Sequence, residues 1–154
     1  MLSFADDSTL YISHSDIHQL FLTANEQLDY LFNWFCANRL SLNANKTKYI
    51  VIRPPHLKPD MTNHNITING IQLDRIGNDC NEKSTKFLGI YLDEHLSWSY
   101  HIAQVKKKVS MALFSLKQVK RVLPTECLKT LYYALVHSHL SYGIIAWGLS
   151  LIHI

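Results

Sequence analysis

The feature that most constrains the fold is a long stretch in which apolar residues recur every three or four positions. It begins after Ser15-Asp16, a pair suited to capping a helix N-terminus, and continues to about Ala37. A single amphipathic helix of this length, about 30 Å long, needs a partner surface to cover its apolar face. We expect that surface to be a sheet, and the aromatic residues of the stripe to belong to the core rather than to a ligand pocket. The stripe consists of Ile17, Leu20, Phe21, Ala24, Leu28, Leu31, Phe32 and Phe35.

Short segments with strand character lie on both sides of this helix. Before it, apolar residues alternate on either side of Asp6-Asp7-Ser8, which predicts a half-buried hairpin with two carboxylates at its tip. After it, Tyr49–Ile52 is apolar and β-branched, which predicts a buried strand. Ile66–Leu73 predicts a second hairpin, because its central Asn-Gly pair supplies a turn with positive φ. Lys86–Leu92 predicts one further strand.

The pattern changes from strands to helices near residue 95. A helix is predicted from His101 to Val119, and another begins at Pro124 or Thr125. The 154 residues are 47% hydrophobic and 18% charged, which suits one compact domain or two small ones and excludes wholesale disorder. The sequence therefore predicts an α+β fold, with a strand-rich first part and a helical second part.

Several classes of function find no support in the composition. The three cysteines, Cys36, Cys80 and Cys127, are too widely spaced for a metal motif or a disulfide framework, so we expect a reduced, intracellular protein. The histidines are scattered and predict no zinc site. No signal peptide or segment of transmembrane length is visible, so we expect no membrane partner.

Two groups of charged residues are candidates for function. Asp6 and Asp7 repel each other unless a cation compensates, and Mg²⁺ fits such a carboxylate pair; the alternative is an ordinary surface turn, where Asp is common. A second group is basic and suits a phosphate backbone, the alternative being a solvated helix face. Its members are Lys106, Lys107, Lys108, Lys117, Lys120 and Arg121. We expect that Lys106, Lys117 and the pair Lys120-Arg121 cannot all face one way on a helix but can form a broad basic flank.

Four motifs follow one another in a specific order along the chain. They are Phe4-Ala5-Asp6-Asp7; the run Trp34–Thr47 (WFCANRLSLNANKT); Lys86–Asp93 (KFLGIYLD) followed by Trp98–Ile102 (WSYHI); and Leu131–Leu135 (LYYAL), Leu140–Gly143 (LSYG) and Trp147-Gly148. Together they resemble the reverse transcriptases (RNA-directed DNA polymerases) of non-LTR retrotransposons of the Jockey and CR1 kind. The resemblance covers nearly the whole chain to Gly148.

The resemblance implies a partial polymerase palm of antiparallel hairpins and one long helix over residues 1–94, then a helical thumb over 95–148. Asp6 and Asp7 would be catalytic palm acids and Mg²⁺ ligands. Lys46 would be a third catalytic residue, near the incoming dNTP, where it would assist proton transfer to the leaving pyrophosphate. Phe87-Leu88-Gly89 resembles the primer grip, where a strand hairpin supports the primer end. The basic helix would lie along RNA template and DNA primer, and the parent enzyme would act in the nucleus.

The chain also departs from the family. The fingers are absent, and so is the palm strand that carries the other catalytic Asp. We therefore expect a fragment without polymerase activity of its own; the alternatives are a non-catalytic primer–template-binding remnant and a translated pseudogene. Residues 149–154 (LSLIHI) match the translation of a transposase sequencing adapter, and we expect them not to be biological.

Overall fold

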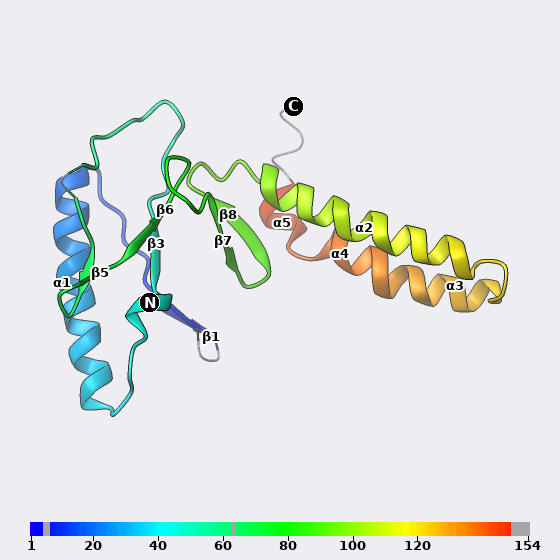
Figure 1. Cartoon of the computed structure of the whole chain (residues 1–154), viewed down its shortest axis with the longest axis horizontal. Helices are drawn as coiled ribbons and strands as arrows, with labels where there is room; N and C mark the ends of the chain where they lie inside the picture. The colour runs from blue at the N-terminus through cyan, green and yellow to red at the C-terminus, as the bar shows by residue number, and fades with distance from the viewer. Residues whose placement is uncertain (5–6, 63, 149–154) are drawn as a thin grey trace. The chain divides into compact units, whose positions relative to one another are not determined.

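The computed structural model of this chain describes residues 1–4, 7–62 and 64–148 (Figure 1). It is a mixed α+β fold that divides into two compact units, unit 1 over Met1–Ile76 and unit 2 from Gly77 onward. The division falls before the boundary predicted at residues 94 and 95, because the strand that ends at Asp93 packs against the helix that follows it. Asp6 and the adapter-like residues 149–154 lie outside the described residues.

Unit 1 begins with the predicted hairpin. Strand β1 (Leu2–Phe4) pairs antiparallel with β2 (Asp7–Thr9), with Phe4 opposite Asp7. The expectation that this hairpin is half-buried is wrong, since Leu2 and Phe4 are 67% and 66% exposed. The alternation of apolar residues reflects the pleat of the strands, but within the described residues β1 and β2 pair only with each other.

Helix α1 (Ile17–Ala37) confirms the long helix and its N-cap. The Asp16 carboxylate accepts hydrogen bonds from the backbone N–H groups of His18 and Gln19, at 3.2 and 3.3 Å. The buried side chains of Phe21 and Ala24 form the core of unit 1 with three apolar residues of the segment that follows β3, Ile66, Ile68 and Leu73.

The small sheets of unit 1 differ in part from the expectation of antiparallel hairpins. β4 (Thr67–Ile68) and β5 (Ile71–Gln72) form the predicted hairpin, with φ of 49° at Asn69 and 74° at Gly70. However, β3 (Lys48–Ile50) pairs in parallel with β6 (Asp74–Ile76). A long connection separates these two strands, so the chain can return in the same direction.

Unit 2 combines one hairpin with a set of helices. The prediction of a single strand over 86–92 is wrong, because the chain reverses at Leu88-Gly89 between β7 (Ser84–Phe87) and β8 (Ile90–Asp93). Helix α2 (Ser99–Val119) then packs against α3 (Thr125–Tyr132) and the segments after it (Figure 1). Those segments are the π-helix η2 (Tyr133–His137), α4 (Ser138–Ser141) and α5 (Ile144–Trp147).

Candidate nucleic-acid interface

The acidic hairpin does not supply a metal centre from the described residues. Asp7 is the first residue of β2 and is exposed, whereas Asp6 lies outside the described part. Across residues 1–4, 7–62 and 64–148, no three His, Cys, Asp or Glu side chains group as a metal site would require. Because Asp6 is one of the two acids that the resemblance assigns to magnesium, the described residues do not test that site, and we derive no step through such an ion.

Lys46 lies in the short 3₁₀ helix η1 (Ala44–Lys46), and its side chain is exposed. The next residue, Thr47, fixes the end of this turn, since its N–H and Oγ1 donate to the Asn43 carbonyl at 3.2 and 3.0 Å. Asp7 and Lys46 form no ion pair with each other in the described structure. The structure thus positions Lys46 without joining it to the described acid of the hairpin.

The residues that resemble a primer grip form the tip of the β7–β8 hairpin. Leu88 and Gly89 both have positive φ, 44° and 87°, and both are exposed. The Tyr142 hydroxyl donates a hydrogen bond to the Leu88 carbonyl, and a Cβ added at Gly89 would lie 3.2 Å from Tyr142 Cε1. Two motifs that are 54 residues apart in the sequence therefore meet at this tip.

The turn after α4 supports the same hairpin. Gly143 has a φ of 63°, and a Cβ there would lie only 2.5 Å from Cδ1 of Ile90 in β8. The indole of Trp147, 5% exposed, donates from Nε1 to the Tyr142 carbonyl at 2.9 Å. The sequence motif alone predicts no separate role for Tyr142, Gly143 or Trp147, although a glycine between two helical segments is a recognisable turn signal.

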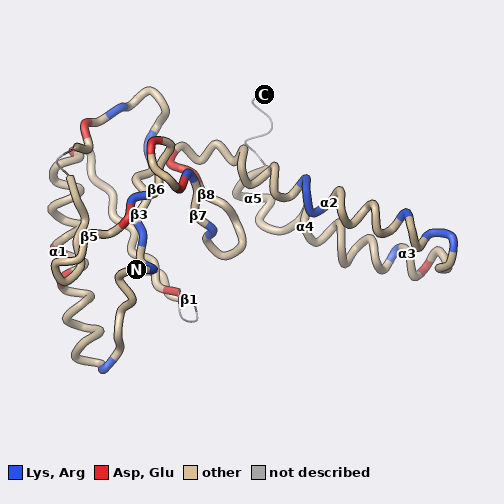
Figure 2. Tube along the Cα trace, in the orientation of Figure 1, with Lys and Arg blue, Asp and Glu red and all other residues tan. Residues whose placement is uncertain are grey.

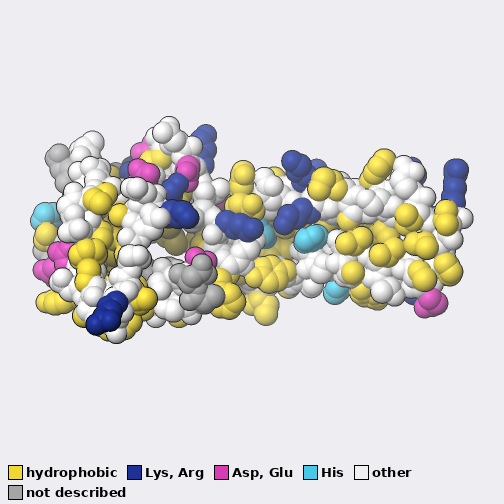
Figure 3. Space-filling view, turned by 60° about the horizontal axis from the view of Figure 1, so that its bottom comes forward, with side chains coloured by type: hydrophobic (Ala, Val, Ile, Leu, Met, Phe, Trp, Pro, Cys, Tyr) yellow, Lys and Arg dark blue, Asp and Glu magenta, His cyan; other side chains and the backbone are white. Residues whose placement is uncertain are grey.

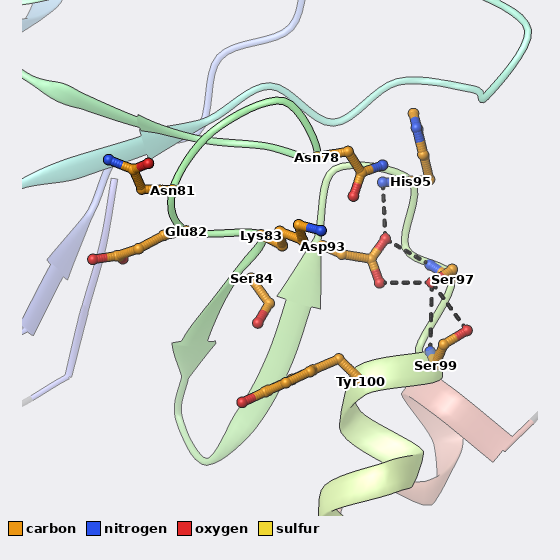
Figure 4. Close-up of a pocket in the computed structure, with 10 residues that line it drawn as sticks. All are labelled: Asn78, Asn81, Glu82, Lys83, Ser84, Asp93, His95, Ser97, Ser99 and Tyr100. Carbon is orange, nitrogen blue, oxygen red and sulfur yellow. Dashed lines mark hydrogen bonds between the residues drawn. The ribbon is translucent and has the colours of Figure 1, made fainter.

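Asp93 organises the loop between β8 and α2 (Figure 4). Its carboxylate accepts hydrogen bonds from the N–H groups of His95 and Ser97, both at 3.0 Å, and from the Ser97 hydroxyl at 2.9 Å. This loop carries two left-handed residues, Leu96 and Trp98, with φ of 50° and 62°. The carboxylate therefore stabilises a backbone that non-glycine residues rarely adopt.

The same carboxylate lines a polar cavity of about 570 Å³, together with Lys83, Ser99 and Tyr100 among others (Figure 4). Burial by itself would raise the pKa of Asp93, but the hydrogen bonds from Ser97, His95 and the Trp98 backbone together lower that pKa below its ordinary value. Because Asp93 is ionised and already accepts these hydrogen bonds, we assign it a structural role.

Helix α2 presents lysines on one face. Lys106 and Lys117 are eleven residues apart, close to three full turns, so they differ by only about 20° around the helix axis. Lys120, the C-cap of α2, lies about 40° to the other side of Lys106 by the same geometry. Lys106, Lys117 and Lys120 therefore share one side of α2, Lys107 and Lys108 point to other sides, and Arg121 lies beyond the C-cap. All six basic residues from Lys106 to Arg121 are exposed.

Charge is segregated along the chain. Residues 95–148 carry seven Lys or Arg and a single acid, Glu126, whereas residues 1–94 carry eight basic and eleven acidic residues. Glu126 is paired with Lys129 at 3.0 Å, and α2 contains no acid. Figure 2 shows this contrast along the trace, and Figure 3 shows lysine and arginine side chains spread over the helical part beside exposed apolar ones. The net charge of +3 for the whole chain is therefore the sum of a basic helical region and a slightly acidic first part.

No protein-family model, curated protein or solved structure matches this chain. In the described residues, the helices are too short or too polar to span a bilayer.

Proposed function

We propose that this chain is part of a non-LTR reverse transcriptase, and that unit 2 binds the phosphate backbone of a primer–template duplex. In this proposal β7–β8 acts as the primer grip and α2 as part of the thumb. The observation that carries it is the acid-free helix α2, which contacts β8 and whose Lys106, Lys117 and C-cap Lys120 share one face. A phosphate backbone is recognised chiefly through such charge contacts, independently of base sequence.

The arrangement at the hairpin tip supports the same proposal. Its two left-handed residues, Leu88 and Gly89, are held by Tyr142 rather than left to move as a free loop. A tip with fixed backbone geometry is suited to contacting the end of a bound strand at one position. Backbone contacts from α2 would then set the register of the duplex relative to that tip.

The binding proposal is tested by filter binding of the full chain to a primer–template duplex over a range of salt concentrations. The triple variant K106Q/K117Q/K120Q removes the shared lysine face, and we expect roughly tenfold weaker binding and a salt slope reduced by about two to three. The control R39Q/K58Q/K83Q changes net charge equally at exposed positions elsewhere, and should bind like wild type. Equal losses in both variants would show unspecific attraction to net charge and contradict the proposal.

We further propose that this chain binds without catalysing extension, because the motifs that resemble the family include Asp6 and Asp7 but not the further palm Asp that helps to hold two metal ions. A primer-extension assay with Mg²⁺ and dNTPs should therefore give no template-dependent product. Extension by the purified chain would overturn this part of the proposal and leave the binding part intact.

A further inference from the structure

A second cavity of unit 2, of about 320 Å³, lies between the β7–β8 hairpin and the helices α2 and α4. None of the ten residues that line it is acidic, whereas Lys86 and Lys108 are basic. Gln104 adds a neutral hydrogen-bond donor, the Ser138 hydroxyl already donates to the Ala134 carbonyl, and Tyr91 and Tyr142 supply apolar wall. The lining thus combines positive charge with donors and provides no carboxylate to compete for them.

His101, which also lines this cavity, is 4% exposed and has an unmet hydrogen-bonding group. Its Nδ1 accepts from the Tyr91 N–H at 3.4 Å, so a neutral ring carries its hydrogen on Nε2. No described residue pairs with that Nε2, although the atom is buried. Burial, and then the charge of Lys108, lower the pKa of His101 and so favour the neutral ring. A buried N–H donor without an acceptor is uncommon in folded proteins.

We propose that this cavity binds a phosphate group, with Lys86 and Lys108 supplying charge and His101 donating from Nε2. A phosphate oxygen would provide the acceptor that the described residues lack, and Gln104 and His139 offer further donors. The phosphate is either one of a nucleic-acid backbone, in which case this inference rests on the proposed function, or a free phosphate. The site is separate from the lysine face, since Lys106, Lys117 and Lys120 do not line it.

The test follows the His101 Nε2 signal of the full chain in long-range ¹H–¹⁵N NMR spectra during titration with inorganic phosphate. Wild type should show a saturable shift, and K86Q/K108Q should bind about tenfold more weakly. Both lysines are exposed, and a circular dichroism spectrum checks that the variant remains folded. K58Q/K83Q, which changes net charge equally outside the cavity, should titrate like wild type. An absent shift, or the same loss in both double variants, would overturn the proposal.

A second arm distinguishes the two sources of phosphate and separates this inference from the proposed function. If duplex DNA competes with phosphate for the His101 signal, the ligand is a backbone phosphate. If phosphate shifts His101 and the duplex neither binds nor competes, the cavity holds free phosphate and only the proposed function fails. If the duplex binds by the filter assay but neither ligand shifts His101, the cavity proposal alone is overturned.

Discussion

At the scale of single residues, the groups that organise unit 2 are polar and buried rather than exposed and catalytic. Asp93 fixes the loop that leads into α2, and His101 begins the inner face of that helix. The sequence could indicate Asp93 as a loop residue, since it ends an apolar strand and is followed by Ser97. It could not reveal that His101 is buried, because a histidine between Tyr100 and Ile102 suits either face of a helix.

Replacing Asp93 with Asn should destabilise unit 2 by about 1–3 kcal/mol, because an amide oxygen is a weaker acceptor and its NH₂ group faces donors. Chemical denaturation followed by circular dichroism measures the change in the free energy of unfolding. D29N, at an exposed position of α1, serves as control and should stay within about 0.5 kcal/mol of wild type. A D93N variant as stable as this control would contradict the role given to the carboxylate.

His101 should make unit 2 less stable in mild acid. Its pKa is lowered in the fold, so below an ordinary value of about 6.5 the unfolded chain takes up a proton that the folded chain resists. The stability that the neutral His101 ring provides is complete above that pH, and it is lost as the pH falls toward the lowered pKa of the folded state. The denaturation midpoint should therefore decrease from pH 7.5 to 5.5, and H101Q should remove part of this decrease.

The exposed His56 provides the comparison for that measurement, since H56Q should keep the full pH dependence of the wild type. If H101Q and wild type lose the same stability between the two pH values, the titration belongs to another group. Asp93 has a lowered pKa as well. The stability that its ionised carboxylate provides is lost only in more acidic solution, below the ordinary pKa of about 3.8.

At the scale of elements, the sequence predicts the helices and turns that have a strong local signal. It does not predict a backbone conformation that depends on contacts between residues far apart in the sequence. Helix α1 and the Asn69-Gly70 turn follow from periodicity and turn chemistry alone, and both are confirmed. At Leu88-Gly89 the sequence predicts a continuous strand, because Leu rarely adopts positive φ. The contact with Tyr142, far along the chain, stabilises that conformation, and no local pattern contains this information.

Gly89 should be the most sensitive position of the β7–β8 hairpin. G89A forces alanine into a left-handed backbone and brings its Cβ to 3.2 Å from Tyr142, so we expect a loss of at least about 1 kcal/mol. A double-mutant cycle with Y142A separates the two causes, because truncating the ring removes the steric part and leaves the backbone strain. Additive losses, measured by denaturation, would show that the ring does not restrict this position.

At the scale of the whole molecule, the chain consists of two compact units, each with its own core. The core of unit 1 centres on Phe21 and Ile68, and unit 2 buries Val136 and Trp147. The charge asymmetry follows the same division in part, because the basic helical residues all belong to unit 2. The sequence predicts the change from strands to helices, but the unit boundary depends on which helix the β7–β8 hairpin packs against.

Removing the Phe21 side chain should affect the two units unequally. F21A creates a cavity in unit 1 and should cost about 3–5 kcal/mol there, while the amides of α2 keep their protection. Hydrogen exchange resolved by residue measures both effects in one sample, and L22A, at a half-exposed position on the same helix, provides a milder control. An equal loss of protection in both units would show that they unfold as one.

The hydrogen bonds that run from the Leu88 carbonyl through Tyr142 to Trp147 have an optical consequence. The indole of Trp147 is almost fully shielded from water, and it stacks edge-on against His101 with the ring centres 5.3 Å apart. Because Tyr142 is hydrogen-bonded to both, a displacement of the hairpin tip should move Tyr142 and alter the polarity around the Trp147 indole. With Trp34 and Trp98 replaced by Phe, the emission wavelength of Trp147 should therefore report on the state of the tip without an added dye.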